Sequence, residues 1–361
     1  MIIFTVVGAR PQFVKAAAVS RVLRLRHTEI LVHTGQHYDP LMSDVFFREL
    51  NIPAPDLHLG VGSGTHAEQT GRMLIDLEAA LLDSRPDMVL VYGDTNSTLA
   101  GALAAAKLNL PVAHVEAGMR SRNRRMPEEI NRVLTDHLAS LLLCSSPSAA
   151  QNLAAEGIVR GVHITGDVMG DLLLEAAARA EGSDIHARLG VTPGAYVLLT
   201  VHRVANTDDP ARLAGIVAAL AVLREQVVFP VHPRTRAALG RAGIDLPANV
   251  RATEPLGYLD TVALERSARV IITDSGGVQK EAYWLAVPCV TLREETEWSE
   301  TVDTGWNILA GADRERIVAA VGSSVRPAAH PQLYGAGEAV ARTVVALGAC
   351  PCDSGLITDA L

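Results

Sequence analysis

Three carboxylates and one histidine stand where acid–base chemistry could use them. Each comes close behind an apolar run or begins a helical pattern: Asp94, Glu116, Glu128 and His202. Carboxylates and imidazoles are the groups that most often transfer protons in enzymes. Because ligands of open parallel sheets bind beyond the carboxyl ends of the strands, these residues suggest an acid–base site.

Each of these residues also has a structural alternative that the sequence leaves open. Asp94 could form an Asx-turn or cap a helix, and Glu128 could stabilise the helix that Pro127 begins. His202 could be a structural histidine. For the neighbouring Glu129, a role at the helix N-terminus is the preferred interpretation.

The segment TDSGGVQKEA (273–282) predicts a phosphate-binding turn. An apolar run leads into Gly276 and Gly277, which let the backbone approach an anion, and the helix that follows favours negative charge at its N-terminus. Ser275 adds a hydroxyl donor, and Glu281 could accept hydrogen bonds from a ribose diol. The structural alternative is a tight turn capped by Ser275 or by the aspartate before it.

A second turn of this kind is GARPQFVK (8–15), in which Pro11 suits the first turn of a helix. Arg10 could bind a pyrophosphate and Lys15 could add a second positive charge. A cation at a helix N-terminus opposes the helix dipole, and a bound anion would relieve that conflict. Two surface cations are the alternative.

The elements that must position these residues are twelve short apolar runs, which alternate with helical patterns. The first set is 2–7, 29–33, 88–92, 111–115, 141–144 and 162–165, and the second is 196–201, 227–231, 249–252, 269–273, 288–292 and 306–309. Such continuous apolar strands predict parallel sheets covered by helices on both faces. We therefore expect an α/β fold of two doubly wound, Rossmann-like domains.

The expected domains are 1–170 and 171–336, with a final helix at about 337–348 that crosses back onto the first domain. The chain of 361 residues is long enough for two such domains, and its 48% hydrophobic and 20% charged residues are typical of a globular protein.

Composition and missing motifs argue against several classes of function. The net charge of −8 disfavours nucleic-acid binding. The four cysteines and the histidines lack zinc-ligand spacing, so no metal is expected, and Cys350 and Cys352 have no assigned role. No GxGxxG follows the first strand, which leaves a nicotinamide cofactor unsupported. No signal-peptide pattern or long apolar run is present, so a cytoplasmic location without a membrane span is expected.

Taken together, these motifs resemble the non-hydrolysing UDP-N-acetylglucosamine 2-epimerase family. The resemblance runs from about residue 3 to about residue 340, with the order and spacing of GARPQFVK, GQHYD, VYGDTNST, HVEAGMRS, PEEINR, HR..N and TDSGGVQKEA. It implies a glycosyltransferase-B-like fold with the active site between two domains, a homodimer, a UDP-sugar substrate and no cofactor. It also implies that UDP is eliminated to give a 2-acetamidoglucal and then added back, with the proton delivered to the opposite face.

Residue by residue, the resemblance implies catalytic roles for Asp94, Glu116, Glu128 and His202. The implied substrate-binding residues are Arg10, Lys15, Arg132, Ser275, Gly276, Gly277 and Glu281. The sequence departs from the family's pattern at two positions where a glutamate is usual. In HRVAN the residue is Ala205, and in GARPQ it is Gln12.

Details such as RPQFVKAAAVSR and GTHAEQTGRML are similar to one branch of the family, which acts on UDP-2,3-diacetamido-2,3-dideoxy-glucuronate. The extra carboxylate of a uronate could meet Arg122, Arg124 or Arg125. A hydrolysing epimerase, a UDP-sugar glycosyltransferase of the same architecture and a non-catalytic nucleotide-sugar sensor remain alternatives.

Overall fold

The computed structural model describes residues 1–36 and 53–349, except for the side chains of residues 10 and 11. Contacts divide the chain into two compact units. The first unit comprises Met1–Leu172 and Gln332–Leu361, and the second comprises Leu173–Pro331.

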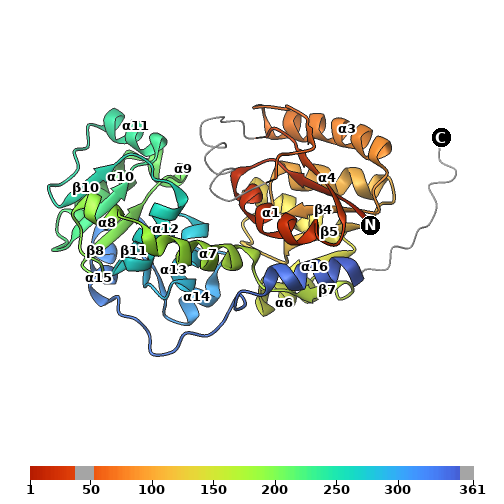
Figure 1. Ribbon diagram of the computed structural model, residues 1–361. Coiled ribbons are helices and arrows are strands. Elements are labelled where there is room, and N and C mark those ends of the chain that lie inside the picture. Colours follow the sequence, from red (N-terminus) through yellow and green to blue (C-terminus); the bar gives the residue numbers. More distant parts are fainter. Residues whose placement is uncertain (37–52, 350–361) are drawn as a thin grey trace. The chain divides into compact units, whose positions relative to one another are not determined.

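The first unit is built on a parallel sheet of seven described strands in the order β3-β2-β1-β4-β5-β6-β7 (Figure 1). The strands are β1 (Ile2–Val7), β2 (Thr28–His33), β3 (Leu57–His58), β4 (Met88–Tyr92), β5 (Val112–Ala117), β6 (Leu141–Cys144) and β7 (Val162–Ile164). The central strands are buried on both faces, because their side chains are almost all Val, Ile, Leu, Ala or Phe.

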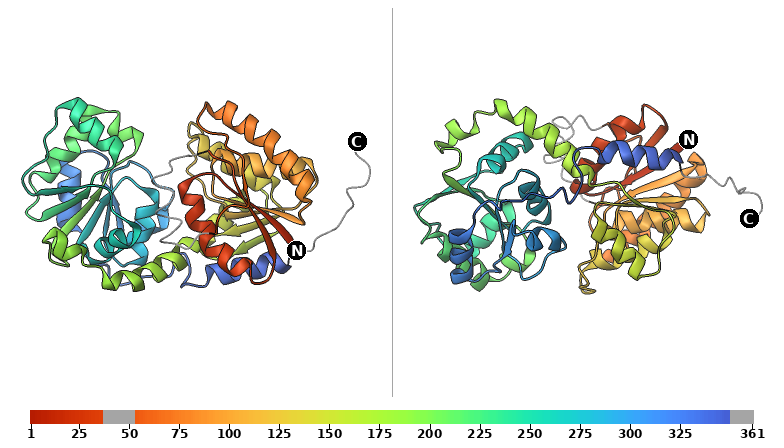
Figure 2. Two further views of the ribbon diagram at one scale, coloured as in Figure 1. Left: turned by 45° about the horizontal axis from the view of Figure 1, so that its top comes forward. Right: turned by 90° about the horizontal axis from the view of Figure 1, so that it is seen from below.

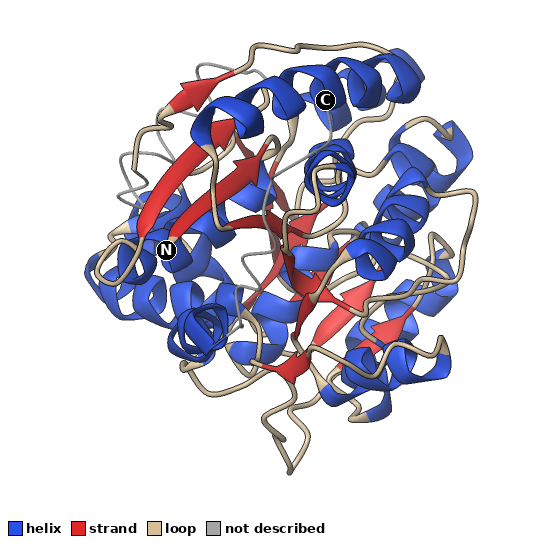
Figure 3. Cartoon of the chain, turned by 90° about the vertical axis from the view of Figure 1, so that its right-hand side faces the viewer, coloured by secondary structure: helices blue, strands red, loops and turns tan. Residues whose placement is uncertain are grey.

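Helices cover this sheet on both faces (Figure 3). They are α1 (Arg10–Leu23), α3 (His66–Ser84), α4 (Asn96–Lys107), α5 (Pro127–Leu138), α6 (Pro147–Ala155), α7 (Val168–Arg179), which runs into the second unit, and α16 (Ala339–Ala349). Helix α4 packs between α3 and α5, and α1 packs against α16. The polypeptide thus returns to the first unit at its last described helix.

The second unit repeats the design with six described strands in the order β10-β9-β8-β11-β12-β13. They are β8 (Tyr196–Thr200), β9 (Gln226–Pro230), β10 (Val250–Thr253), β11 (Val270–Thr273), β12 (Cys289–Thr291) and β13 (Asn307–Leu309). The helical segments are η1 (Ala180–Gly182), α8 (Ile185–Leu189), α9 (Val204–Thr207), α10 (Pro210–Leu220), α11 (Pro233–Ala242), α12 (Tyr258–Ser267), α13 (Gly276–Trp284), α14 (Ser299–Asp303) and α15 (Arg314–Ser323) (Figure 2).

The prediction of two parallel α/β sheets is confirmed, and all twelve predicted strands are present. The sequence missed β3, because a strand of two exposed residues carries no apolar signal. In each sheet the strand order reverses at the middle, between β1 and β4 and between β8 and β11. Ligands of such sheets bind beyond the carboxyl ends of the strands at this reversal.

Within residues 1–36 and 53–349, no helix combines the length and the apolar character needed to cross a bilayer.

Asp171 on α7 secures the start of α16. Its carboxylate accepts backbone hydrogen bonds from Ala339 at 3.2 Å and from Val340 at 2.8 Å, which satisfies amides that the helix itself leaves unpaired. We expect Asp171→Ala to lower the free energy of unfolding by about 1–2 kcal/mol, the usual cost of losing a helix cap. Asp76→Ala, at an exposed position of α3, is the matched control, and chemical denaturation measures both. Equal stability of the two variants would contradict this role.

Candidate active site

In the first unit, Asp94 lies just beyond β4, where the strand order reverses. Its carboxylate forms an ion pair with Arg132 of α5, and its carbonyl oxygen accepts a hydrogen bond from Asn131 at 3.0 Å. Thr95 caps helix α4, so Asp94 is not needed as a cap. The side chain of Asp94 stays 32% exposed and is therefore within reach of a ligand.

The pKa of Asp94 is raised above its ordinary value. Burial is the main cause, and the negative charges of Glu116 and Glu128 add to it. The cations of Arg132 and Lys15 act in the opposite direction. These four charges are therefore close enough to Asp94 to set its protonation, as expected for an acid–base group.

Glu116 is turned toward this site by an irregularity in its strand. The register of β5 against β6 shifts between Val115 and Ala117, and Glu116 adopts a positive φ of 72°, which a residue with a side chain rarely does. Its carboxylate forms an ion pair with Lys15 of α1, and the two side chains are only 13% and 10% exposed. A bulge thus presents the carboxylate, at a cost in backbone strain.

Gly93 brings the two carboxylates to one turn. Its φ is 62°, and a Cβ at this position would lie 3.3 Å from Glu116 Oε2 and 3.5 Å from Lys15 Nζ. The next residue in the chain is Asp94. The backbone of Gly93 is therefore the common neighbour of both ion pairs, and a side chain here would meet both the unfavourable positive φ and the crowding by Glu116.

The two glutamates at the start of α5 have different roles. Glu128 is exposed, and its charge acts on Asp94. Glu129 is buried, accepts from the backbone amides of Ser121 and Arg122 at 2.9 and 2.8 Å, and lies 3.3 Å from Arg132. Glu129 therefore organises the preceding loop, a task the sequence did not reveal.

Helix α1 begins at Arg10, whose side chain lies outside the described part of the chain. Gln12 accepts from the amides of Gly8 and Ala9 at 2.8 and 3.0 Å and donates to the carbonyl of Tyr92 at 2.7 Å. An amide can accept and donate together, so Gln12 ties this turn to the end of β4. Of the motif GQHYD, residues 37–39 also lie outside the described residues.

In the second unit, a buried carboxylate positions His202. Asp274 is fully buried and accepts from the backbone amides of His202 and Arg203 at 3.0 Å and from the side chain of Asn206 at 3.1 Å. The His202 ring nitrogen Nδ1 lies 3.4 Å from the same carboxylate, while the side chain remains 41% exposed. The sequence placed Asp274 at the turn but did not reveal this role.

The predicted phosphate-binding turn begins helix α13, and Ser275 is its N-cap. Beside it, a Cβ on Gly276 would lie 3.4 Å from the indole nitrogen of Trp298, 3.7 Å from a guanidinium nitrogen of Arg203 and 4.0 Å from a carboxylate oxygen of Glu297. A Cβ on Gly277 would meet only the Ser275 hydroxyl, at 3.8 Å, among the described residues. The free amides of the first turn and these two donors make the turn suitable for an anion.

Glu281, further along α13, is almost fully buried and lies among acidic groups. Its charge, after burial itself, raises the pKa of Tyr258 and of the fully buried Glu265 well above their ordinary values. Burial and the charge of Glu281 therefore favour the neutral form of Glu265, and the carboxylate oxygens of Glu281 could accept hydrogen bonds from a ribose diol.

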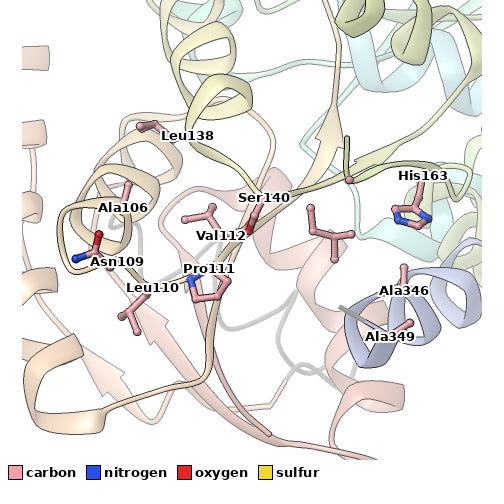
Figure 4. A pocket seen from close by; sticks show the side chains of 12 residues that line it. Ala106, Asn109, Leu110, Pro111, Val112, Leu138, Ser140, His163, Ala346 and Ala349 are labelled. Atoms are coloured by element: carbon pink, nitrogen blue, oxygen red, sulfur yellow. The ribbon is translucent and has the colours of Figure 1, made fainter. Parts of the chain in front are cut away.

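A cavity in the first unit contains neither the residues around Asp94 and Glu116 nor those around His202 and Ser275. It has a volume of about 650 Å³ and lies at the first residues of β5 and β6, near Pro111 and Ser140, beside Ala346 of α16 (Figure 4). This edge of the sheet is opposite the carboxyl ends of the strands, and its lining is mainly apolar. We assign it no role in the chemistry.

The candidate site residues of the two units suit different chemistry. The first unit holds two carboxylates, each paired with a cation, at a single turn, which suits proton transfer. The second holds a histidine and a helix N-terminus beside the Arg203 guanidinium and the Trp298 indole nitrogen, which suits an anion such as a phosphate. Among the described residues, no three His, Cys, Asp or Glu side chains cluster as metal ligands.

Comparisons with known proteins agree on one family. A family model described as UDP-N-acetylglucosamine 2-epimerase matches residues 23–348. A UDP-2,3-diacetamido-2,3-dideoxy-D-glucuronate 2-epimerase of Pseudomonas aeruginosa is 48% identical over 95% of this chain and 98% of that protein. A UDP-N-acetylglucosamine 2-epimerase homolog of Methanococcus maripaludis is 51% identical over 94% and 96% of the two chains.

Solved structures agree with this result. The UDP-GlcNAc 2-epimerase of Methanocaldococcus jannaschii, crystallised with UDP-GlcNAc and UDP, has a TM-score of 0.88 and 41% identity over 96% of this chain and 99% of that one. The calicheamicin glycosyltransferase CalG4, at 15% identity and a TM-score of 0.53, shares the fold alone, which is of the glycosyltransferase-B type. The chain belongs to the UDP-N-acetylglucosamine 2-epimerase family.

Proposed function

We propose that this protein is a non-hydrolysing epimerase that interconverts UDP-N-acetylglucosamine and UDP-N-acetylmannosamine. The observation that carries the proposal is the pair of carboxylates at the Gly93 turn, each with its own cation, in a member of this family. The hydrogen at C2 is not adjacent to a carbonyl, so its direct removal as a proton is too costly. The reaction must therefore couple removal of the C2 proton to the departure of UDP from C1.

In the proposed elimination, a carboxylate takes the C2 proton, a C1=C2 double bond forms, and the C1–O bond breaks with its electron pair on UDP. In the return step a UDP oxygen attacks C1 while C2 receives a proton on the opposite face. Asp94, Glu116 and Glu128 are the proposed proton-transfer groups. His202 is proposed to act on the departing diphosphate, as an acid or as a hydrogen-bond donor.

The substrate is proposed to be held through its nucleotide. The Ser275 turn with Gly276 and Gly277 would bind the diphosphate through helix amides, and Glu281 would accept the ribose hydroxyls. Arg10 and Lys15 are further proposed contacts, Lys15 also being the partner of Glu116. Arg132 would keep Asp94 in place.

Incubation with UDP-GlcNAc in D2O tests the function. We expect deuterium at C2 in both epimers and no net release of UDP, because the same UDP is added back. Mass spectrometry and proton NMR measure both quantities. Free N-acetylmannosamine with stoichiometric UDP would instead indicate a hydrolysing epimerase. UDP release that depends on an acceptor would indicate a glycosyltransferase, and no deuterium exchange would contradict any epimerase.

The diacetamido-uronate is a second candidate substrate, favoured by the 48% identical relative. Arg122 and Arg124 line a cavity of about 560 Å³ together with Glu129, which contacts Arg132 of the Asp94 pair. Within the described residues, neither arginine forms an ion pair, so both guanidinium groups are available to a carboxylate.

If the uronate is the substrate, its kcat/KM will exceed that of UDP-GlcNAc. Arg122→Gln and Arg124→Gln will then lower kcat/KM for the uronate by about 10-fold or more, the usual loss of a charged hydrogen bond, and leave the plain sugar nearly unchanged. A clear preference of the wild type for UDP-GlcNAc would exclude this alternative. Steady-state kinetics with both sugars measures the difference.

The pH dependence should report the charges around Asp94. Its ionised form is the base, so kcat/KM should rise with pH through its pKa, which burial raises above the ordinary value of about 3.9. Arg132→Gln removes a cation that lowers this pKa. The rise of kcat/KM with pH should therefore occur at higher pH in this variant. Glu128→Gln also removes a proposed proton-transfer group and should lower kcat, but the loss of its anion should lower the pKa of Asp94 and move the pH dependence of the remaining activity to lower pH.

Asp94→Asn is the reference variant for this series, and we expect it to lower kcat by about 10²–10⁴-fold, the usual value of a general acid or base. Shifts of the pH dependence in the same direction for the Arg132 and Glu128 variants would show that Asp94 is not the titrating group.

A homodimer, a cytoplasmic location and a role in polysaccharide precursor synthesis stay predictions. Two pairs of apolar side chains support the dimer, because they are exposed on α3 and α5, the helices that flank α4: Ile75, Leu82, Ile130 and Leu134. A monomeric mass by light scattering would contradict it.

A further inference from the structure

A buried histidine that the proposed mechanism does not use lies directly behind the Gly93 turn. His114, in the middle of β5, is fully buried. Its Nε2 lies 2.7 Å from the carbonyl oxygen of Gly93, and its Nδ1 lies 2.7 Å from Oδ1 of Asp136 on α5. Both ring nitrogens therefore face acceptors.

The partners of Asp136 decide how many protons the ring carries. Asp136 also accepts from the amide of Gly118 at 3.1 Å and from Arg120 at 2.7 Å. Burial alone would raise its pKa, but His114 and Arg120 outweigh burial, and the pKa is lowered. Asp136 is therefore an anion, and His114 satisfies an anion and a carbonyl only with a hydrogen on each nitrogen.

Arg120 extends this contact network to the surface. It donates two hydrogen bonds of 2.7 Å to Glu156, whose side chain is 31% exposed, and one of 2.7 Å to the fully buried Asp136. Such a fully paired network holds its members rigidly. The hydrogen bond from His114 to Gly93 connects this network to the reactive turn.

That contact lies where a small shift has a large effect. Gly93 precedes Asp94, and its Cα faces the Glu116–Lys15 pair, because a Cβ added to it would lie 3.3 Å from Glu116 Oε2. Rotation of the Gly93 peptide would move Asp94 and open space beside Glu116 together. A misplacement of about 1 Å can cost about 10²-fold in rate.

We propose that His114 is a positioning residue for the epimerisation, which holds the Gly93 carbonyl and thereby sets the placement of both Asp94 and Glu116. It does not touch the reacting atoms. This inference rests on the proposed function, because it assigns His114 to that reaction.

Two substitutions separate positioning from stability. In His114→Gln the side-chain amide nitrogen can take the place of Nε2 and still donate to Gly93, while the bond to Asp136 is lost. In His114→Asn the amide nitrogen takes the place of Nδ1, so the Asp136 bond is kept and the Gly93 bond is lost. Losing a bond to a charged group destabilises more than losing one to a carbonyl, so His114→Gln should have the lower melting temperature.

The activities should have the opposite order. We expect His114→Asn to lower kcat by about 10-fold to 100-fold with KM changed by less than about threefold, and His114→Gln to keep kcat within about threefold of the wild type. Equal losses of kcat, or a larger loss in His114→Gln, would mean that the network acts through stability alone and would overturn the proposal. So would an unchanged kcat in His114→Asn.

A measurement on the wild type covers the case in which a variant does not fold or the proposed function fails. In protein labelled with ¹⁵N-histidine, both ring nitrogens of His114 should show a directly bonded hydrogen. A ring with a single N–H would overturn the assignment whatever the substrate is. An inactive wild type with both N–H groups present would instead contradict the epimerase function while keeping the hydrogen-bond assignment.

Discussion

Two carboxylates can stay charged at one turn of a protein only if each has a cation of its own. Repulsion between neighbouring anions otherwise forces one of them to take up a proton. In this protein Arg132 pairs with Asp94 and Lys15 pairs with Glu116, and Gly93 lies between the pairs. The pKa of Asp94 is nevertheless raised, mainly by burial, so the cations of Arg132 and Lys15 only partly offset the cost of burying its charge.

The groups that hold the site are more buried than the groups that would react. Asp274, Asp136 and Glu129 are each almost or fully buried, and each accepts several hydrogen bonds from backbone or charged donors. His202 and Asp94, by contrast, keep part of their surface open. A buried carboxylate with all its donors fixes the backbone around it, because breaking any one contact would leave a charge unpaired in a low dielectric.

What could be predicted from the sequence was local. The twelve strands follow from continuous apolar runs, and the turn at Ser275 follows from its glycines and the helix after them. The partners could not be predicted, because Lys15 and Glu116 are 101 residues apart and the bulge at Glu116 has no signature in an apolar pattern.

The arginines that precede α5 also show what could not be predicted from the sequence. All three line the same cavity and look alike in the sequence, but Arg120 forms ion pairs with Asp136 and Glu156, whereas Arg122 and Arg124 form none within the described residues. Burial and long-range pairing distinguish them, and neither property can be read from residue type and spacing. The same holds for Glu128 and Glu129, which are neighbours with different tasks.

The return of α16 to the first unit affects how the protein is made. The first unit encloses the second in the chain, so its sheet is synthesised early but the helix that packs on α1 emerges last. At roughly 5–20 residues per second, the ribosome needs about ten to thirty seconds to complete the intervening segment. During that time the face of α1 that α16 will cover is open to water or to a chaperone, and the inserted unit can fold before the enclosing one is finished.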